Sequence, residues 1–207
     1  KLALRKLRRL TRSGRGNELD LPGTVRSTAA NAGWLDLRTR PTRSNSMKLL
    51  LMLDVGGSMD DHVELVDQLF SAARAEFKNL EHIYFHNCLY ERVWKDNRRR
   101  WTETTPTLEL LRTWPRDTRV VCVGDASMST WEIVNEGGSV EHWNEEAGAV
   151  WMQRVLQHFE RAVWINPVPF EFWEYTRSIA MLRELMGERM VPLTLAGIDE
   201  AVGLLKA

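Results

Sequence analysis

Two acidic residues stand directly after apolar runs in this chain. Asp54 follows the apolar residues 49–53, and Asp125 follows the apolar residues 120–123 after one glycine. Such runs are typical of buried parallel strands, and ligand sites of α/β proteins lie at the carboxyl ends of those strands. If the two strands are neighbours, their carboxylates meet, and they then need a proton or a cation between them.

Hydroxyl groups extend this set of possible ligands. Ser58 begins a helical pattern four residues after Asp54, and Thr105 lies at the start of another predicted helix. Carboxylates and hydroxyls without His or Cys suit Mg²⁺, Mn²⁺ or Ca²⁺ rather than Zn²⁺. We therefore predict a metal site formed by Asp54, Ser58, Thr105 and Asp125, and no catalytic residue. An alternative stays open, in which these side chains only cap helices and turns.

The elements that position these residues alternate between strand and helix. Strands are predicted at residues 47–53, 82–86, 89–94, 119–123, 162–166 and 190–195. Helices are predicted from 58 to 77, from 104 or 105 onward, and at 145–159, 178–186 and 197–205. This alternation predicts an α/β fold with a doubly wound, mostly parallel, six-stranded sheet flanked by helices. In the strand order 3-2-1-4-5-6, the strands that precede Asp54 and Asp125 are neighbours.

The first 46 residues differ in charge from the remainder. Residues 1–46 carry 11 Lys or Arg and 3 Asp or Glu, a net charge of +8, so the neutral chain has −8 elsewhere. We predict a basic N-terminal extension (1–46) with helices at 1–12 and 20–30, an edge strand at 34–40 and a linker, followed by the main domain (47–207). The basic arm either docks on the acidic domain or binds a partner or nucleic acid. Since the chain does not begin with Met, a longer parent protein is also an open possibility.

Composition points to a cytoplasmic protein. The 207 residues are 43% hydrophobic and contain two cysteines, which suggests no disulfide framework. Neither a signal peptide nor an apolar run long enough for a membrane span is present in the sequence. An aromatic cluster at residues 170–175 is predicted to be a lid over the core.

Taken together, these segments resemble a known family. Residues 54–59, Asp-Val-Gly-Gly-Ser-Met, are similar to the first motif of the metal-ion-dependent adhesion site of von Willebrand factor A (VWA) domains, Asp-x-Ser-x-Ser. Thr105 resembles the motif's threonine, and Asp125 in Val-Gly-Asp resembles its second aspartate. The blocks at 84–87, 123–128 and 141–148 resemble the bacterial CoxE-like branch of this family.

The resemblance implies a non-catalytic, metal-dependent adaptor. Such domains bind an acidic side chain of a partner through the metal, and CoxE-like proteins are associated with MoxR-type AAA+ ATPases that remodel or mature another protein. Gly56 departs from the motif, because the family usually has a serine there. Two outcomes are open: weaker affinity with water in place of the hydroxyl, or a site that fills when a partner contributes a carboxylate.

Enzyme functions fit the sequence less well. A phosphotransferase that uses Asp54 as nucleophile needs a second Asp two residues later, where Gly56 stands. The hydrolase motif Gly-x-Ser-x-Gly fails at Asp60, and no Gly-Lys-Ser/Thr loop for ATP follows the strand. Magnesium-dependent phosphoryl transfer and nucleic-acid binding through the basic arm remain the alternatives to an adaptor.

Overall fold

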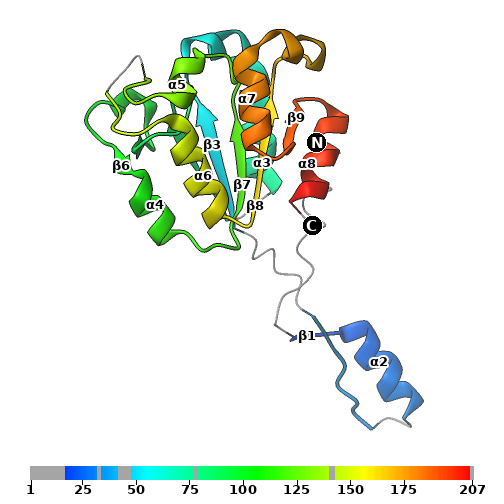
Figure 1. Ribbon diagram of the computed structural model, residues 1–207. Helices are drawn as coiled ribbons and strands as arrows, with labels where there is room; N and C mark the ends of the chain where they lie inside the picture. Colours follow the sequence, from blue (N-terminus) through cyan, green and yellow to red (C-terminus); the bar gives the residue numbers. More distant parts are fainter. Residues whose placement is uncertain (1–16, 32–33, 42–47, 77–78, 140–142, 206–207) are drawn as a thin grey trace.

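A parallel sheet of five strands forms the centre of the protein (Figure 1). The computed structural model describes residues 17–31, 34–41, 48–76, 79–139 and 143–205. The strands, in spatial order, are β4 (Leu80–Phe85), β3 (Leu49–Asp54), β7 (Arg119–Val123), β8 (Arg161–Asn166) and β9 (Met190–Pro192). All four pairings are parallel, so the carboxyl ends of the five strands lie at one edge.

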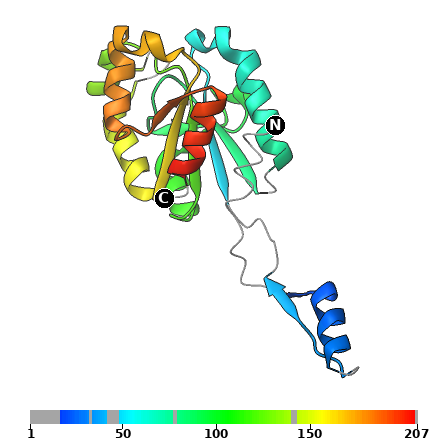
Figure 2. The ribbon, with the colours of Figure 1, turned by 90° about the vertical axis from the view of Figure 1, so that its right-hand side faces the viewer.

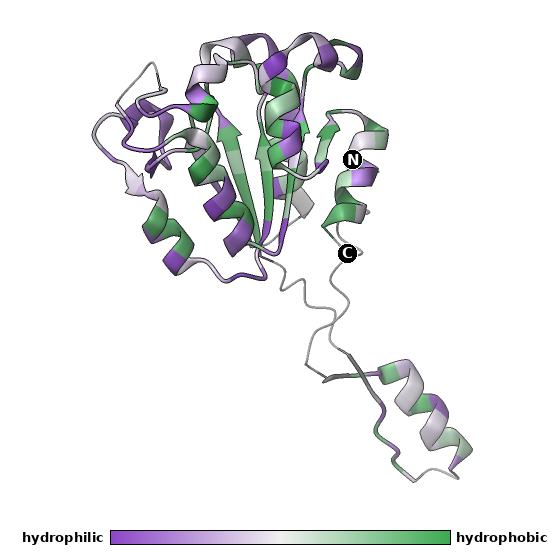
Figure 3. Cartoon of the chain, in the orientation of Figure 1, coloured by the Kyte–Doolittle hydropathy of each residue, from purple (hydrophilic) through white to green (hydrophobic). Residues whose placement is uncertain are grey.

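Helices cover both faces of this sheet. The helices are α3 (Val63–Glu76), α4 (Thr107–Thr113), α5 (Thr130–Val134), α6 (Gly148–His158), α7 (Arg177–Leu185) and α8 (Leu195–Leu204). Two buried clusters show the layers: α4 to α7 pack on one face, and α3 and α8 pack on the other. Alternate strand residues point to opposite faces, and apolar strands therefore stand between the helical layers (Figure 3).

The predicted fold class is confirmed, but the predicted number of strands is wrong. Residues 89–94 do not join the main sheet as a sixth strand. They contain β5 (Arg92–Val93), which pairs with β6 (Thr105–Pro106) in a separate antiparallel sheet. A single bridge between Tyr84 and Trp94 links this segment to the edge strand β4. The segment buries Leu89, Tyr90 and Val93 in the core cluster that also contains residues of α4 to α7, and only two of its residues form a ladder.

The strand order preserves the feature on which the predicted site depends. The order β4-β3-β7-β8-β9 corresponds to 2-1-3-4-5, rather than the longer predicted order. β3 and β7 are nevertheless neighbours, with Leu53 opposite Val123 at their carboxyl ends. The prediction that the strands before Asp54 and Asp125 lie side by side is confirmed.

The described N-terminal residues form a small unit. β1 (Asn17–Leu19) pairs antiparallel with β2 (Thr39–Pro41), and α2 (Leu21–Ala30) connects them (Figure 2). Asp20 caps α2 by accepting a hydrogen bond from the backbone N–H of Gly23, as expected for a helix at 20–30. The predicted edge strand at 34–40 is shortened and shifted to β2. The helix predicted at 1–12 lies outside the described residues, and the boundary after residue 46 and the basic extension stay predictions.

Other boundaries also differ from the sequence pattern. Residues 129–144, where no element was predicted, contain α5, and the aromatic segment forms the 3₁₀-helix η4 (Phe170–Tyr175). α4 begins at Thr107, because Pro106 is its N-cap residue. The other 3₁₀-helices are η2 (Gly57–His62) and η3 (Asn97–Arg99). Within the described part of the chain, no helix has the length and apolar character that a membrane span requires.

Gly124 allows β7 to approach β3 at their carboxyl ends. A Cβ atom at this position would lie 2.8 Å from Asp54 Cβ and 3.0 Å from Trp164 Cζ2. We expect Gly124→Ala to lower the free energy of unfolding by about 1–3 kcal/mol, because the buried neighbours have no room to move. Urea unfolding measures this change. Gly57→Ala is the matched control, since a Cβ there meets nothing within 4 Å; equal losses in the two variants would contradict this account.

Candidate metal and ligand site at the carboxyl edge of the sheet

Asp54 is the last residue of β3 and is buried, with 4% of its surface exposed. Its Oδ1 accepts hydrogen bonds from the backbone N–H groups of Gly56 and Asn87, each 2.8 Å long. Its Oδ2 has no hydrogen-bond partner among the described residues, and it is also buried. The backbone thus fixes the carboxylate through one oxygen and leaves the second oxygen able to accept a ligand.

Asp125 lies in the loop after β7 and is 2% exposed. Its Oδ1 accepts a hydrogen bond of 2.9 Å from the backbone N–H of Ser127. Between them, Ala126 has φ = 57°, a left-handed conformation that residues other than glycine adopt at an energetic cost. Met59 Sδ and the buried Asn166 amide bind the backbone N–H and carbonyl of Asp125, respectively. The loop is therefore held in one conformation from several sides.

Ser58 links the first loop to the second. It lies in η2, and its Oγ donates to the backbone carbonyl of Ser127 at 3.5 Å, the long end of the hydrogen-bond range. The structure therefore brings three of the predicted metal ligands, Asp54, Ser58 and Asp125, to one place at the edge of the sheet.

The contacts of Thr105, the fourth predicted metal ligand, differ from those of the other three residues. It belongs to β6, opposite Val93, and is half-buried. No hydrogen bond in the described part of the protein joins it to Asp54, Ser58 or Asp125. Its role as a metal ligand stays a prediction. The later hydroxyl, Thr107 Oγ1, donates to the Tyr90 carbonyl at 2.5 Å inside the core, so that group is already used.

A third loop, after β4, completes the surroundings of Asp54. Asn87 has φ = 57° and its Nδ2 donates to both carboxylate oxygens of Glu132, at 3.0 and 3.3 Å. Glu132 lies on α5 and is 4% exposed. Neither residue was identified from the sequence. A polar residue directly after a strand was a usable signal for Asn87, whereas a five-residue helix has no period that could reveal Glu132.

Burial alters the acidity of the site. It is the main reason why the pKa of Asp54 is raised from 3.8 to about 7. The negative charges of Asp125 and Glu132 also raise this pKa, while the hydrogen bonds from Gly56 and Asn87 partly offset the increase. A cation beside the carboxylate would favour its charged form and so take the place of the proton.

The donor set fits a hard divalent cation that binds few carboxylates. Within the described ranges, no group of three or more His, Cys, Asp or Glu side chains could hold a metal ion. A cation at this edge would therefore be held by Asp54, Asp125, neutral oxygens such as that of Ser58, and water. Mg²⁺ accepts such a mixture, because it retains several of its waters.

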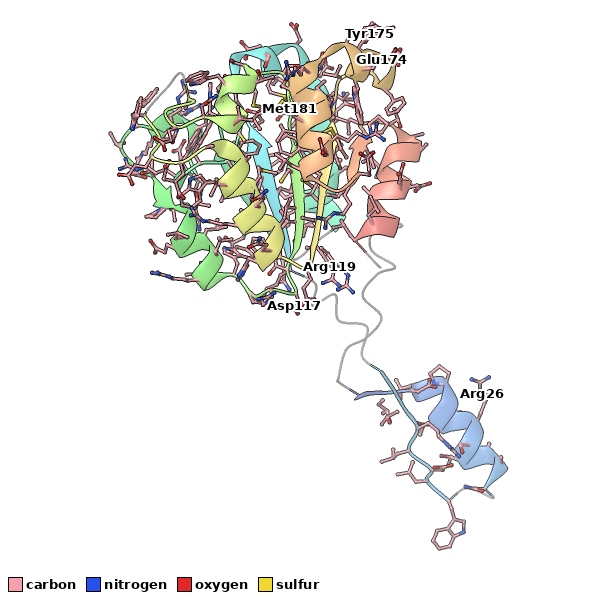
Figure 4. The ribbon with its side chains drawn as sticks, viewed as in Figure 1. Arg26, Asp117, Arg119, Glu174, Tyr175 and Met181 are labelled. Carbon is pink, nitrogen blue, oxygen red and sulfur yellow. The ribbon has the colours of Figure 1, made fainter. Side chains whose placement is uncertain are left out.

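The surface around the site is partly hollow and partly apolar. A cavity of about 320 Å³ lies beside the end of β3 and is lined by Asp54, Gly56, Asp60, Asp67 and Tyr84, among others. Exposed aromatic side chains occur on the segments that follow β7 and β8. We call those on α5 and η4 the aromatic rim: Trp131, Phe170, Phe172 and Tyr175. Figure 4 shows Tyr175 at the end of the protein opposite Arg119, the first residue of β7.

The prediction that the aromatic segment 170–175 is a lid over the core is wrong for most of its residues. Phe170, Phe172 and Tyr175 are 55%, 53% and 77% exposed, and only Trp173 is buried, with its Nε1 donating to the Val168 carbonyl. The 3₁₀ geometry of η4 explains this outcome, because roughly three residues per turn leave room for one apolar contact per turn with the core.

Comparison with known proteins agrees with this geometry. The family model described as VWA domain containing CoxE-like protein matches residues 1–93, a range that crosses the predicted boundary after residue 46. Together with the parallel α/β sheet, this match over less than half of the chain supports a VWA CoxE-like domain protein. No curated protein and no solved structure matches the chain. The similarity to this family suggests an adaptor-like domain for protein interactions.

The raised pKa of Asp54 predicts a pH-dependent stability. The unfolded chain ionises this group above about pH 4 and the folded protein above about pH 7, so the folded state holds more protons in between. Asp54 therefore lowers stability progressively from pH 4 to pH 7 and by a constant amount above. In metal-free buffer, wild type should lose up to about 4 kcal/mol relative to Asp54→Asn between pH 4 and pH 8.

Denaturant unfolding at several pH values tests this prediction. Asp60→Asn removes the same charge from an exposed position on η2 and controls for net charge. Identical pH slopes for wild type and Asp54→Asn would show that the burial of Asp54 has no thermodynamic consequence.

Proposed function

We propose that this protein is a non-catalytic adaptor that binds a partner protein through a divalent cation at the carboxyl edge of its sheet. Mg²⁺ is the expected ion, with Mn²⁺ or Ca²⁺ as substitutes. The observation that carries this proposal is the buried Oδ2 of Asp54, which lacks a hydrogen bond beside a second buried carboxylate, Asp125. Asp54, Ser58 and Asp125 would hold the cation, and a carboxylate of the partner would complete its coordination.

The charge balance supports this arrangement. Two ionised carboxylates bring the net charge around a divalent cation to zero, so an additional acidic ligand from a partner is acceptable. A third carboxylate from this protein would repel the partner's carboxylate and so weaken its binding to the cation. Glu132, a further buried acid close to Asp54, is instead directed to the amide of Asn87.

The aromatic rim supports a protein partner rather than a small solute. Exposed Trp and Tyr side chains are enriched at protein interfaces, where they contribute much of the binding energy. We infer that a MoxR-type AAA+ ATPase, with a client protein that it remodels, binds on this side. The resemblance to CoxE-like proteins and the position of the rim after β7 and β8 support this inference.

Gly56 argues against the phosphotransferase alternative. A phosphotransferase that uses Asp54 as its nucleophile needs a second Asp two residues later, and Gly56 stands at that position. We also infer that the protein acts in the cytoplasm. Its two cysteines, Cys88 and Cys122, are free and buried, which agrees with a reducing compartment.

Binding of Mg²⁺ should stabilise the folded protein. At a Mg²⁺ concentration 100 times Kd, the gain is about 2.7 kcal/mol, or a rise in Tm of about 5–10 °C for a domain of this size. The rise should be larger at pH 8 than at pH 6, because protons compete with the cation for Asp54. Calorimetric melting of wild type and Asp54→Ala measures it; an equal rise in the variant would place the ion elsewhere.

The aromatic rim should contribute to partner affinity and not to stability. Trp131 is 60% exposed, so Trp131→Ala should change Tm by less than about 2 °C and weaken binding of a MoxR-type ATPase about tenfold. Trp101→Ala is the matched control, since Trp101 is 61% exposed in the connection between β5 and β6. The affinity is measured with the ATPase immobilised on a surface and each variant in solution with Mg²⁺. Similar affinities for the two variants would show that the rim is not the contact.

A further inference from the structure

The side-chain position of residue 56 is already filled by another residue. A Cβ atom built on Gly56 would lie 2.1 Å from Asn87 Oδ1 and 3.3 Å from Asp54 Oδ1. Gly56 itself has φ = −58° and ψ = 153°, a conformation open to any residue. Turn geometry therefore does not require this glycine, contrary to what the Gly-Gly sequence suggests. The amide of Asn87 is what excludes a side chain at position 56.

Glu132 determines which end of the Asn87 amide faces Gly56. A carboxylate only accepts hydrogen bonds, so the amide nitrogen must be directed to Glu132, as the distances of 3.0 and 3.3 Å show. The carbonyl oxygen is then directed to the other side, toward Gly56, where the Cβ position lies near both Asn87 Oδ1 and Asp54 Oδ1. The backbone N–H of Asn87, at 2.8 Å from Asp54 Oδ1, fixes the position of the same residue through its main chain.

We propose that Asn87 Oδ1 is a cation ligand that replaces the hydroxyl group absent at position 56. The proposal rests on the proposed metal-dependent function and assigns to it a ligand from the loop after β4. An amide carbonyl is a neutral, hard oxygen donor like a serine hydroxyl, so the exchange keeps the charge of the site and its preference for Mg²⁺, Mn²⁺ or Ca²⁺. Glu132 acts as a positioning residue for this oxygen and not as a ligand.

The backbone role of Asn87 can be separated from the role of its side chain. Asn87 has φ = 57°, which glycine also adopts readily, and its N–H bond to Asp54 does not need a side chain. Asn87→Gly therefore removes the amide oxygen and leaves the loop and the fixed Oδ1 of Asp54 in place. The same change clears the space for a serine at position 56.

Exchange of the two residues tests the proposal by titration calorimetry with Mg²⁺ alone. Asn87→Gly should weaken Mg²⁺ binding about 10–100-fold, a loss of the size seen when the surroundings of a metal are altered. Gly56→Ser alone should also bind weakly, because its side chain collides with Asn87 Oδ1. The double variant Gly56→Ser/Asn87→Gly should recover most of the wild-type affinity. Thermal melting verifies that each variant is folded.

Each outcome supports or overturns a defined claim. Wild-type affinity in Asn87→Gly would overturn the assignment of Asn87 and leave the proposed function intact. Absence of Mg²⁺ binding to the wild type would overturn the proposed function and this assignment together. Glu132→Gln should weaken Mg²⁺ binding less than Asn87→Gly does. Glu136 lies after α5, and Glu136→Gln is the control for the loss of one negative charge. Equal effects of these two variants would remove the positioning role of Glu132.

Discussion

A carboxylate buried at the end of β3 constrains the rest of this structure. Asp54 sits between two parallel neighbours, with Phe85 opposite it on β4 and Gly124 close to it after β7. Removing a carboxylate from water is unfavourable unless hydrogen bonds or a cation compensate, and the backbone supplies bonds to only one of its oxygens. The remaining free-energy cost is what a proton or a metal ion can relieve.

The loops that surround Asp54 are fixed rather than adaptable. Two of the three non-glycine residues with positive φ in the described ranges, Asn87 and Ala126, lie in these loops. Such conformations persist where neighbouring contacts impose them, and here Glu132 and Asn166 supply those contacts. The scaffold thus holds oxygen atoms from three loops close together before any ligand arrives, which lowers the entropic cost of binding.

Strand patterns in the sequence were sufficient to predict the sheet, whereas features that depend on loop conformation were missed. Alternation of strands and helices placed Asp54 and Asp125 on neighbouring strands, because few topologies satisfy a parallel sheet. The same pattern predicted one strand too many for the sheet. The apolar segment 89–94 is largely buried in the core, but only two of its residues pair with another strand. The role of Gly56 could not be predicted, because it depends on Asn87, a residue 31 positions away whose side chain is oriented by Glu132.

The most direct measurement of the central claim locates the cation in the folded protein. Sub-stoichiometric Mn²⁺ added to ¹⁵N-labelled protein broadens amide signals within about 10–15 Å of the ion, a range smaller than the length of a six-residue strand at about 3.3 Å per residue. We expect the amides of residues 56–58, 87 and 125–127 to broaden first, and that of Arg119, at the other end of β7, to stay sharp. Uniform broadening, or broadening that begins at Arg119 or at the exposed acid Asp117 beside it, would contradict a cation site at Asp54.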